Sequence, residues 1–462
     1  MFKTLKNAWK TPDLQKKMFF TLIVILLYRL GACIFVPYVS SSVSEAFQTN
    51  YGTSVLGLMS VLSGGAMQYA TLFALSVSPY ITASIVMQLL TIAIPALERM
   101  AKDGENGKKK ITAITRVVTV ALALITAYGY TMYLENMFSS YITYASQKGA
   151  ALWFCRITLI LCYCAGAALI MWLAEKINEK GIGNGISIIL FANIVSRVPT
   201  YLTSTIPNIA KACTKAIEQE VVATILNVVI YIAVVAVILA AFGFVVWFTG
   251  SERRIPITYA KRVVGRKMYG GQSSSLPLKL NMSGVMPIIF ANSIVALPAT
   301  IAAFFTNVKK DSWLYFAKDF FDQMTDVLSY TSPLYLIIFI ALIIAFSYFY
   351  IMISFNPVEV ANNIRNNGGS VPGIRPGKPT VDYIKKILNR VTLIGGLFLC
   401  VISGLPLLIT IVVNLFDASA AASLSELAFS GSSLLIVVGV ALETVRELEA
   451  QITLRNYKGF LD

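Results

Sequence analysis

The side chains that most often perform acid–base chemistry or bind metals are scarce in the apolar stretches of this chain. Its 462 residues include no histidine, which removes the commonest general base and the commonest metal ligand. Aspartate and glutamate are almost absent from the interiors of the apolar stretches, so a proton relay or a sodium site would lack carboxylates. Five of the six cysteines lie in these stretches, which argues against a disulfide framework or a thiolate metal site. The sequence therefore predicts no catalytic residue, no metal and no cofactor.

One charge lies deep inside an apolar stretch, namely Arg29 in the string YRLGACIFVP. A charge inside a membrane is costly and is kept for pairing or for function. Arg29 either lines an aqueous path or pairs with a neighbouring helix or a partner subunit. We favour the pairing.

Aliphatic residues at helical spacing are the other candidates. Ile81 and Ile85 are four residues apart in PYITASIVMQLL and lie on one helix face, and Ile186 and Leu190 repeat this spacing in GIGNGISIIL. Taken alone, such residues are typical of plain packing in a membrane helix.

Ten long apolar stretches must position these residues. A helix that crosses a bilayer core needs roughly 20 apolar residues, and hydrophobic residues make up 56% of this chain against 13% charged residues. The predicted spans are 18–39, 72–94, 112–134, 151–174, 182–200, 221–248, 282–305, 332–355, 391–414 and 431–451. The sequence thus predicts an all-α polytopic membrane protein with ten transmembrane helices.

The basic residues set the orientation of these helices. With a cytoplasmic N-terminus, the cytoplasmic segments carry 28 of the 38 Lys and Arg residues, the outer segments carry 6 and the spans carry 4. Cytoplasmic loops of membrane proteins have this excess of positive charge. We therefore expect both termini to be cytoplasmic.

The segment 55–70 breaks the alternation of spans and polar loops. Its string VLGLMSVLSGGAMQYA is apolar and uncharged, too short to cross the membrane, and interrupted by Gly64 and Gly65. It predicts a half-helix that folds back into the protein, where surrounding protein shields its backbone. A helical cap on the outer surface is the alternative.

Two long loops, about 250–280 and 356–390, are basic and rich in Pro and Gly. Basic loops can serve only to set topology. Their length and the tyrosines Tyr259 and Tyr269 instead suggest a docking surface for a large anionic or mixed partner.

The ten spans divide evenly around the outer segment 201–220, which gives an N-terminal half, 1–200, and a C-terminal half, 221–462. Five is an odd number, so the two halves are inverted relative to each other, as in many transporters. A secondary transporter is therefore an alternative function, although we find no polar site at the midplane. An intramembrane protease is disfavoured by the missing His and the lack of an intramembrane Asp pair.

Seven strings occur in the order and topology of one known family. They are PYITASIVMQLL, GIGNGISII, RRIPITYAKR, QSSSLPLKLNMSGVMPIIF, NPVEVANNIRNNGG, VPGIRPGKPT and SLLIVVGVALE. Together they closely resemble the bacterial SecY family, the protein-conducting channel of the general secretion pathway. The match extends from the basic N-terminus to the NYKGF tail.

The resemblance implies an hourglass channel of two five-helix halves, hinged at 201–220. It implies opening across the membrane for secreted chains, and sideways between the second, third, seventh and eighth spans for membrane segments. The residues that match the pore ring of the family are Ile81, Ile85, Ile186, Leu190, Ile289 and Ile436. Those that match the plug are Gly57, Leu58, Met59, Leu62, Gly64 and Gly65. Those that match the docking sites for SecA and the ribosome are Arg253, Arg254, Lys261, Arg262 and Arg375.

Partners and location also follow from the resemblance. It implies SecE and SecG subunits, the SecA ATPase, the ribosome, signal sequences, nascent polypeptides and membrane lipids, all at the bacterial cytoplasmic membrane. Three positions depart from the family pattern: Leu190 replaces a common Ile, Ser275 a common His and Lys176 a common Gln. An aliphatic constriction excludes ions by dewetting yet has no hydrogen-bonding preference for any passing sequence. We therefore expect a channel whose energy comes from a bound ATPase or ribosome, and not an enzyme.

Overall fold

The computed structural model describes most of the chain. The described residues are 9, 11–40, 43–44, 60, 63–138, 141–143, 149–200, 203, 220–259, 262–264, 267–269, 273–302, 314–328, 332–416 and 430–458. The predicted hinge, 201–220, therefore lies outside them apart from its two residues 203 and 220.

A helix lies in each of the ten predicted spans. These helices are α2 (Pro12–Gly31), α5 (Ser78–Ala93), α7 (Gly104–Met137), α8 (Ala150–Lys180), α9 (Gly185–Thr200), α11 (Glu220–Gly250), α12 (Met286–Ala302), α14 (Pro333–Ser354), α16 (Lys378–Phe416) and α18 (Ser430–Lys458). Among the described residues, five helices are long and apolar enough to cross a membrane, or six if a bent pair forms one span. Two more, α9 and α12, are shorter apolar helices, with Pro199 and Pro298 near their ends. The chain is a multi-pass, predominantly helical membrane protein.

Capping residues explain where several helices begin. The Ser332 hydroxyl accepts a hydrogen bond from the backbone N of Leu334, and Pro333 occupies the first turn of α14. The Asn356 side chain does the same for Val358 at the start of the short helix α15 (Pro357–Asn366). A polar N-cap followed by proline satisfies the free backbone donors of a helix start.

At two span edges the structure has turns where the sequence predicted helix. The first helix ends at Gly31 instead of continuing to 39, and the second begins at Ser78 instead of 72. The intervening pieces pair with each other, because Phe35 and Thr71 form a β-bridge and the backbone N of Leu72 donates to Ile34 O at 2.9 Å. Apolar turns buried in protein have the same composition as a membrane helix, so hydropathy alone does not separate them.

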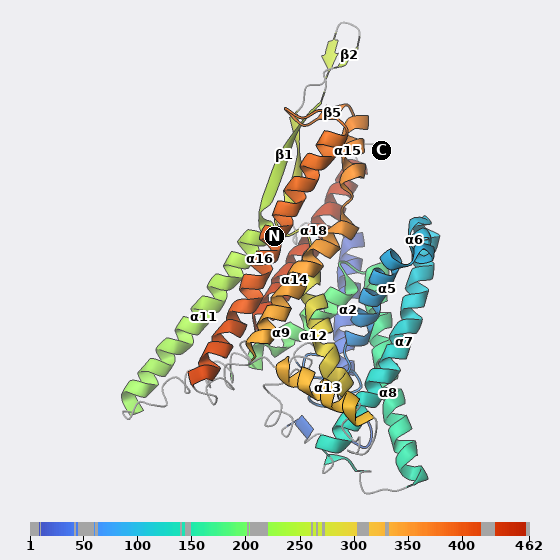
Figure 1. Ribbon diagram of the computed structural model, residues 1–462, viewed down its shortest axis with the longest axis vertical. Coiled ribbons are helices and arrows are strands. Elements are labelled where there is room, and N and C mark those ends of the chain that lie inside the picture. Colours follow the sequence, from blue (N-terminus) through green and yellow to red (C-terminus); the bar gives the residue numbers. More distant parts are fainter. Residues whose placement is uncertain are drawn as a thin grey trace.

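The long helices form a closed ring. Contacts connect α8 to α7, α7 to α5, α5 to α12, α12 to α14, α14 to α16, α16 to α18, α18 to α9, and α9 back to α8. Helix α2 packs on α8 and α9, and α11 packs on α18. Figure 1 shows α7 and α8 side by side, with α11 and α16 on the opposite side of the molecule. The N-terminal and C-terminal helices of the ring thus meet at two seams, α5 with α12 and α9 with α18.

Strands occur in the two basic loops, where the sequence suggested irregular chain. Strand β1 (Glu252–Tyr259) pairs antiparallel with β4 (Ser273–Lys279), and β5 (Gly369–Ser370) pairs with the far end of β1. A second hairpin joins β2 (Arg262–Val264) to β3 (Lys267–Tyr269). Ile255 and Ile257 of β1 are buried between exposed neighbours, which is the two-residue period of a strand.

Two further short helices connect the long ones. Helix α6 (Pro95–Lys102) bends by 101° from α5 and packs on the start of α7. Helix α13 (Leu314–Val327) lies between α12 and α14 and packs on α12.

Candidate functional site

The structure brings the six predicted ring residues into one buried cluster. Two come from α5, two from α9, one from α12 and one from α18. They are Ile81, Ile85, Ile186, Leu190, Ile289 and Ile436, each with at most 9% of its surface exposed. Because α5 and α9 belong to one half of the chain and α12 and α18 to the other, this cluster lies where the two halves meet.

The string GIGNGISII places two of these side chains at the start of α9. The Asn184 side chain accepts hydrogen bonds from the backbone N of Ile186 at 3.1 Å and of Ser187 at 3.5 Å. The Asn178 side chain accepts another from Gly185 N at 2.7 Å. These two asparagines satisfy donors that the helix itself leaves free, so α9 starts directly at the ring.

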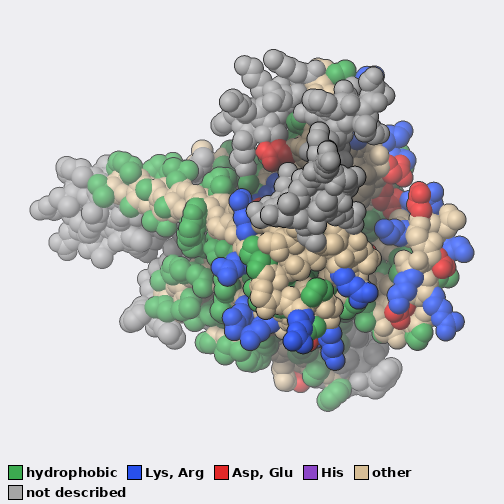
Figure 2. Space-filling view, turned by 90° about the horizontal axis from the view of Figure 1, so that it is seen from above, with side chains coloured by type: hydrophobic (Ala, Val, Ile, Leu, Met, Phe, Trp, Pro, Cys, Tyr) green, Lys and Arg blue, Asp and Glu red, His purple; other side chains and the backbone are tan. Residues whose placement is uncertain are grey.

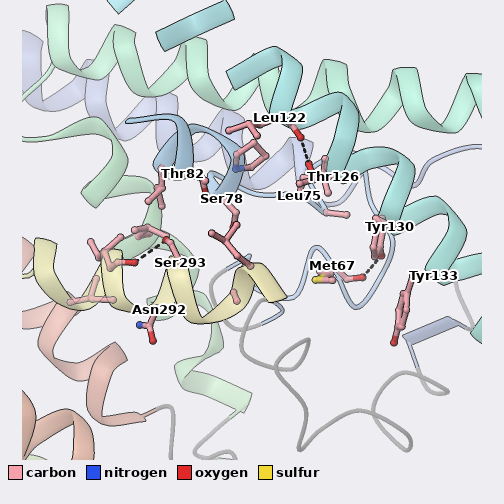
Figure 3. A pocket seen from close by; sticks show the side chains of 18 residues that line it. Met67, Leu75, Ser78, Thr82, Leu122, Thr126, Tyr130, Tyr133, Asn292 and Ser293 are labelled. Atoms are coloured by element: carbon pink, nitrogen blue, oxygen red, sulfur yellow. Dashed lines mark hydrogen bonds between the residues drawn. The ribbon is translucent and has the colours of Figure 1, made fainter. Parts of the chain in front are cut away.

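A cavity of about 110 Å³ adjoins the ring. Four ring residues line it, namely Ile81, Leu190, Ile289 and Ile436. Ser78, Thr82, Thr126, Asn292 and Ser293 line it as well. Figure 3 shows Ser78 and Thr82 on α5, Thr126 on α7 and Ser293 on α12, with Asn292 on the lower side of α12. The Asn292 Nδ2 atom is buried and has no hydrogen-bond partner among the described residues. The cavity therefore lies at the seam between the halves and has an apolar wall with a few polar groups.

The described part of the segment 55–70, which we call the re-entrant segment after its predicted role, packs against the six aliphatic residues. Its Ala66 belongs to the same buried cluster as the six aliphatic residues. The Tyr130 hydroxyl of α7 donates to the Met67 carbonyl at 2.6 Å, as Figure 3 shows, and the Tyr163 hydroxyl of α8 donates to the Ala70 carbonyl at 3.4 Å. Buried tyrosines on two helices thus hold the segment by its backbone.

From Ser63 onward, this segment consists of turns. Gly64 and Gly65 have φ angles of +64° and +90°, a conformation that glycine adopts without steric cost. Of the other predicted plug residues, Gly57, Leu58, Met59 and Leu62 lie outside the described residues. The expected half-helix therefore remains a prediction, and the described turns begin at Ser63.

Arg29 contacts the turns of the segment 55–70, and its pairing with a neighbouring helix or a partner subunit stays a prediction. Its Nη1 atom lies 3.5 Å from the Gly64 carbonyl oxygen. The sequence analysis missed Arg197, whose Nη2 atom donates to Gln68 Oε1 at 2.9 Å. A charged residue within a predicted span could have identified Arg197 as a candidate. However, Arg197 lies near the end of the fifth span, where arginines are common at the membrane interface.

Two ion pairs join α7 to α8. Arg116 Nη2 lies 2.8 Å from Glu175 Oε2, and Arg156 Nη2 lies 2.6 Å from Glu135 Oε2. Arg156 also lies over the Trp153 ring at 5.5 Å from its centroid. Both ends of the α7–α8 pair are therefore connected by charge-assisted hydrogen bonds.

The basic loops meet at one end of the molecule. Strand β5 of the second loop pairs with β1 of the first, with Thr258 opposite Ser370. Arg253 and Arg254 are exposed on β1, and Arg375 is exposed just before α16. Arg262 lies on β2, and Lys261 lies outside the described residues. Figure 2 views this end from above and shows many more Lys and Arg than Asp and Glu side chains around its centre.

The base of the β1–β4 hairpin is also cationic. Burial lowers the pKa of the Lys279 ammonium group, and the nearby Arg446 guanidinium lowers it further. Arg446 of α18 donates to the Thr249 carbonyl near the end of α11 at 2.9 Å. This hydrogen bond connects α18, which carries Ile436, to the chain just before the hairpin.

Comparison of this fold with solved structures defines the class of protein. The structure described as "The structure of a protein conducting channel" aligns with a TM-score of 0.62 and 15% identity, covering 94% of this chain and 92% of that one. "Sec61 in the Canine ribosome-channel complex from the endoplasmic reticulum" aligns with a TM-score of 0.59 and 14% identity over the same shares. The fold is that of the protein-conducting channels.

Sequence comparison gives the family within this class. The SecY family model matches residues 71–445. The "Protein translocase subunit SecY" of Streptomyces galbus is 40% identical over 465 residues, and that of Mycobacterium tuberculosis (strain ATCC 25618 / H37Rv) is 37% identical over 475 residues, each alignment covering all of both chains. The chain belongs to the SecY family, which confirms the resemblance inferred from its sequence strings.

Proposed function

We propose that this SecY-family chain is the central channel subunit of a general secretory translocon. It passes unfolded polypeptides across the membrane and releases transmembrane segments sideways into the lipid. The observation that carries the proposal is the burial of six aliphatic side chains, contributed by both halves of the chain, in one cluster against a re-entrant segment.

The aliphatic cluster is the proposed pore ring. Aliphatic side chains exclude water and ions from a narrow opening by dewetting. They leave no polar group unsatisfied when the opening widens, so the ring can deform around an extended chain of any sequence. The re-entrant segment, including the predicted plug residues 57–67, would complete the seal in the resting state. Translocation then requires no catalytic group in the channel itself.

The seam between α5 and α12 is the proposed lateral exit. The flanking helices are α7 on one side and α14 on the other, so separation of α5 from α12 would open the ring toward lipid. The 110 Å³ cavity shows that packing at this seam is already incomplete. The proposed hinge is the connection 201–220 between the halves 1–200 and 221–462.

The joined basic loops are the proposed docking surface. We assign contacts with the ribosome to Arg253, Arg254, Lys261 and Arg262, and contact with the SecA ATPase to Arg375. A cationic surface favours association with anionic partners, and its effect weakens as salt increases. SecE and SecG are the proposed partner subunits. The location is the bacterial cytoplasmic membrane with both termini cytoplasmic, which the bacterial relatives and the excess of basic residues in alternate loops support.

The test is SecA- and ATP-dependent import of a radiolabelled secretory precursor into proteoliposomes that contain this chain and a SecE-like partner. We expect protease-protected precursor with the wild-type chain, loss of protection with Arg375→Glu, and retention with Arg99→Glu. Arg99 is also an exposed arginine, on α6 and outside the two basic loops, so it controls for the change of charge. Absence of protected precursor in sealed wild-type vesicles would favour a small-solute transporter instead.

A further inference from the structure

Two arginines from different helices contact the same short stretch of the re-entrant segment. Arg29 of α2 donates from Nη1 to the Gly64 carbonyl at 3.5 Å. Arg197 of α9 donates from Nη2 to Gln68 Oε1 at 2.9 Å and to Ser60 Oγ at 3.5 Å. The contacts therefore reach the segment from two sides.

The acceptors of these two cations are neutral. Within the described part of the chain, neither Arg29 nor Arg197 forms an ion pair with a carboxylate, whereas Arg116 and Arg156 both do. Hydrogen bonds from a cation are stronger than neutral ones, and low surrounding dielectric strengthens them further. Because the acceptors lie on the re-entrant segment, the two guanidinium groups lose them when that segment moves away.

The segment fits tightly between the two helices. A Cβ atom added to Gly64 would lie 2.8 Å from both Arg29 Nη1 and Asn193 Oδ1, and 3.1 Å from the Asn193 Cα. Asn193 also donates to Ser76 Oγ at 3.4 Å. Close packing at Gly64 and hydrogen bonds to Ser60, Gly64, Gln68 and Ser76 thus hold the described part of this stretch between α2 and α9.

We infer that Arg29 and Arg197 are positioning residues that hold the re-entrant segment in its closed position through cation-to-neutral hydrogen bonds. The inference rests on the proposed function, because it assigns this segment to the seal. When the segment leaves, both cations exchange these acceptors for water, so the net strength of their hydrogen bonds favours return of the segment over a prolonged open state. The strength of this clamp therefore determines how often the channel opens without a substrate.

The first test measures ion-conducting openings in planar bilayers, with no precursor present. We expect Arg197→Gln to raise the open fraction on the order of tenfold, because it removes a charge-assisted hydrogen bond. Arg29→Gln should have a smaller effect, since its contact is longer. Arg99→Gln removes the same charge from an exposed site on α6, outside the two basic loops, and should leave the open fraction unchanged. An unchanged open fraction in both Arg29→Gln and Arg197→Gln would overturn the inference.

The second test reverses the sign of the effect. Gln68→Glu places a carboxylate opposite Arg197 and should lower the open fraction below that of the wild type, although it loses a weak 3.4 Å donation from Gln68 to the Ser44 carbonyl. The same substitution combined with Arg197→Gln should give no reduction. General damage to the segment would raise the open fraction in both backgrounds, and that result would overturn the inference.

Deletion of 57–67 in the same assay separates this inference from the proposed function. Suppose that the deletion variant leaks ions while Arg29→Gln and Arg197→Gln do not. This result would refute the role of the two arginines and leave the proposed sealing role of the segment standing. A tight channel after the deletion would instead refute the seal. Precursor import by each variant shows that the channel has assembled.

Discussion

The sharpest prediction concerns two neighbouring residues of α12 that point into different clusters. Ile289 belongs to the cluster of the proposed ring, whereas Ile288 is buried among helices of the C-terminal half alone. Their exposed surfaces are 4% and 0%. The same substitution at both positions therefore compares a ring site with a packing site of equal burial.

The magnitude follows from what Ile→Ser removes and adds. Loss of about three carbon groups from a buried side chain costs about 2 kcal/mol, and a buried hydroxyl without a partner costs about 1–3 kcal/mol more. Each variant should therefore destabilise its buried state by about 3–5 kcal/mol. At position 289 an open, wet ring relieves this cost, so the balance shifts toward opening by about a hundredfold or more. At position 288 the residue stays buried in both states, and the cost lowers only the stability of the fold.

The assay is single-channel conductance in planar bilayers, together with thermal unfolding of the purified complex. We expect Ile289→Ser to leak ions and to accept precursors with defective signal sequences, and Ile288→Ser to lower the unfolding temperature without leaking. Ile81→Ser, Ile85→Ser and Ile186→Ser should behave like Ile289→Ser. Equal leakage from Ile288→Ser and Ile289→Ser would show that general destabilisation opens the channel. Unchanged conductance in Ile289→Ser would refute the ring.

Further predictions concern the re-entrant segment and the membrane ion pairs. Deleting 57–67 should raise the resting conductance while import continues; complete loss of import would make the segment a structural support. Gly64→Ala should also raise the resting conductance, because Gly64 has a φ of +64° and an added Cβ would lie 2.8 Å from Arg29 Nη1. An unchanged resting conductance would contradict the close packing of Gly64 against Arg29. Arg156→Met should lower the thermal stability by about 3 kcal/mol because it removes the ion pair with the mostly buried Glu135 carboxylate. Glu135→Leu in the same chain should restore much of this stability, and equal stability of the single and double variants would contradict the prediction.

Hydropathy predicted the ten membrane helices because each apolar stretch must bury its own backbone in lipid. It failed at 72–77, where apolar residues form a buried turn next to Phe35 and its neighbours. Hydropathy also did not predict that α16 begins at Lys378, well before the predicted edge at 391. The first turns of this helix are polar, and a search for long apolar stretches does not detect a polar helix. The strand over 252–259 was recognisable in principle, because Ile255 and Ile257 alternate with polar residues and proline.

The site was predictable only in part. Family strings identified the six aliphatic residues that the structure gathers in one cluster. No pattern pointed to the partner of Arg197, because Gln68 lies 129 positions away and on a segment without regular structure. Contacts of this kind depend on the tertiary fold, which spacing along a single helix does not report.

The positions of the ion pairs among the long helices match the separation of α5 from α12 that the proposed function requires. Both membrane ion pairs, Arg116 with Glu175 and Arg156 with Glu135, join α7 to α8 within one half. Among the described residues, no ion pair crosses the seam between α5 and α12. Separating a buried pair leaves an uncompensated charge and is costly, so α7 and α8 should move together.

The opposite seam has a polar connection between the halves. Lys17 Nζ of α2 donates to Gln451 Oε1 of α18 at 3.2 Å, next to the contact of α18 with α9. The α5–α12 seam instead consists of aliphatic and hydroxyl groups around a partly empty cavity. When this seam opens, its apolar side chains contact lipid. Lipid tails are themselves apolar, so this exposure lacks the free-energy cost that contact with water would have. We therefore expect the two halves to separate between α5 and α12 and to stay in contact between α9 and α18.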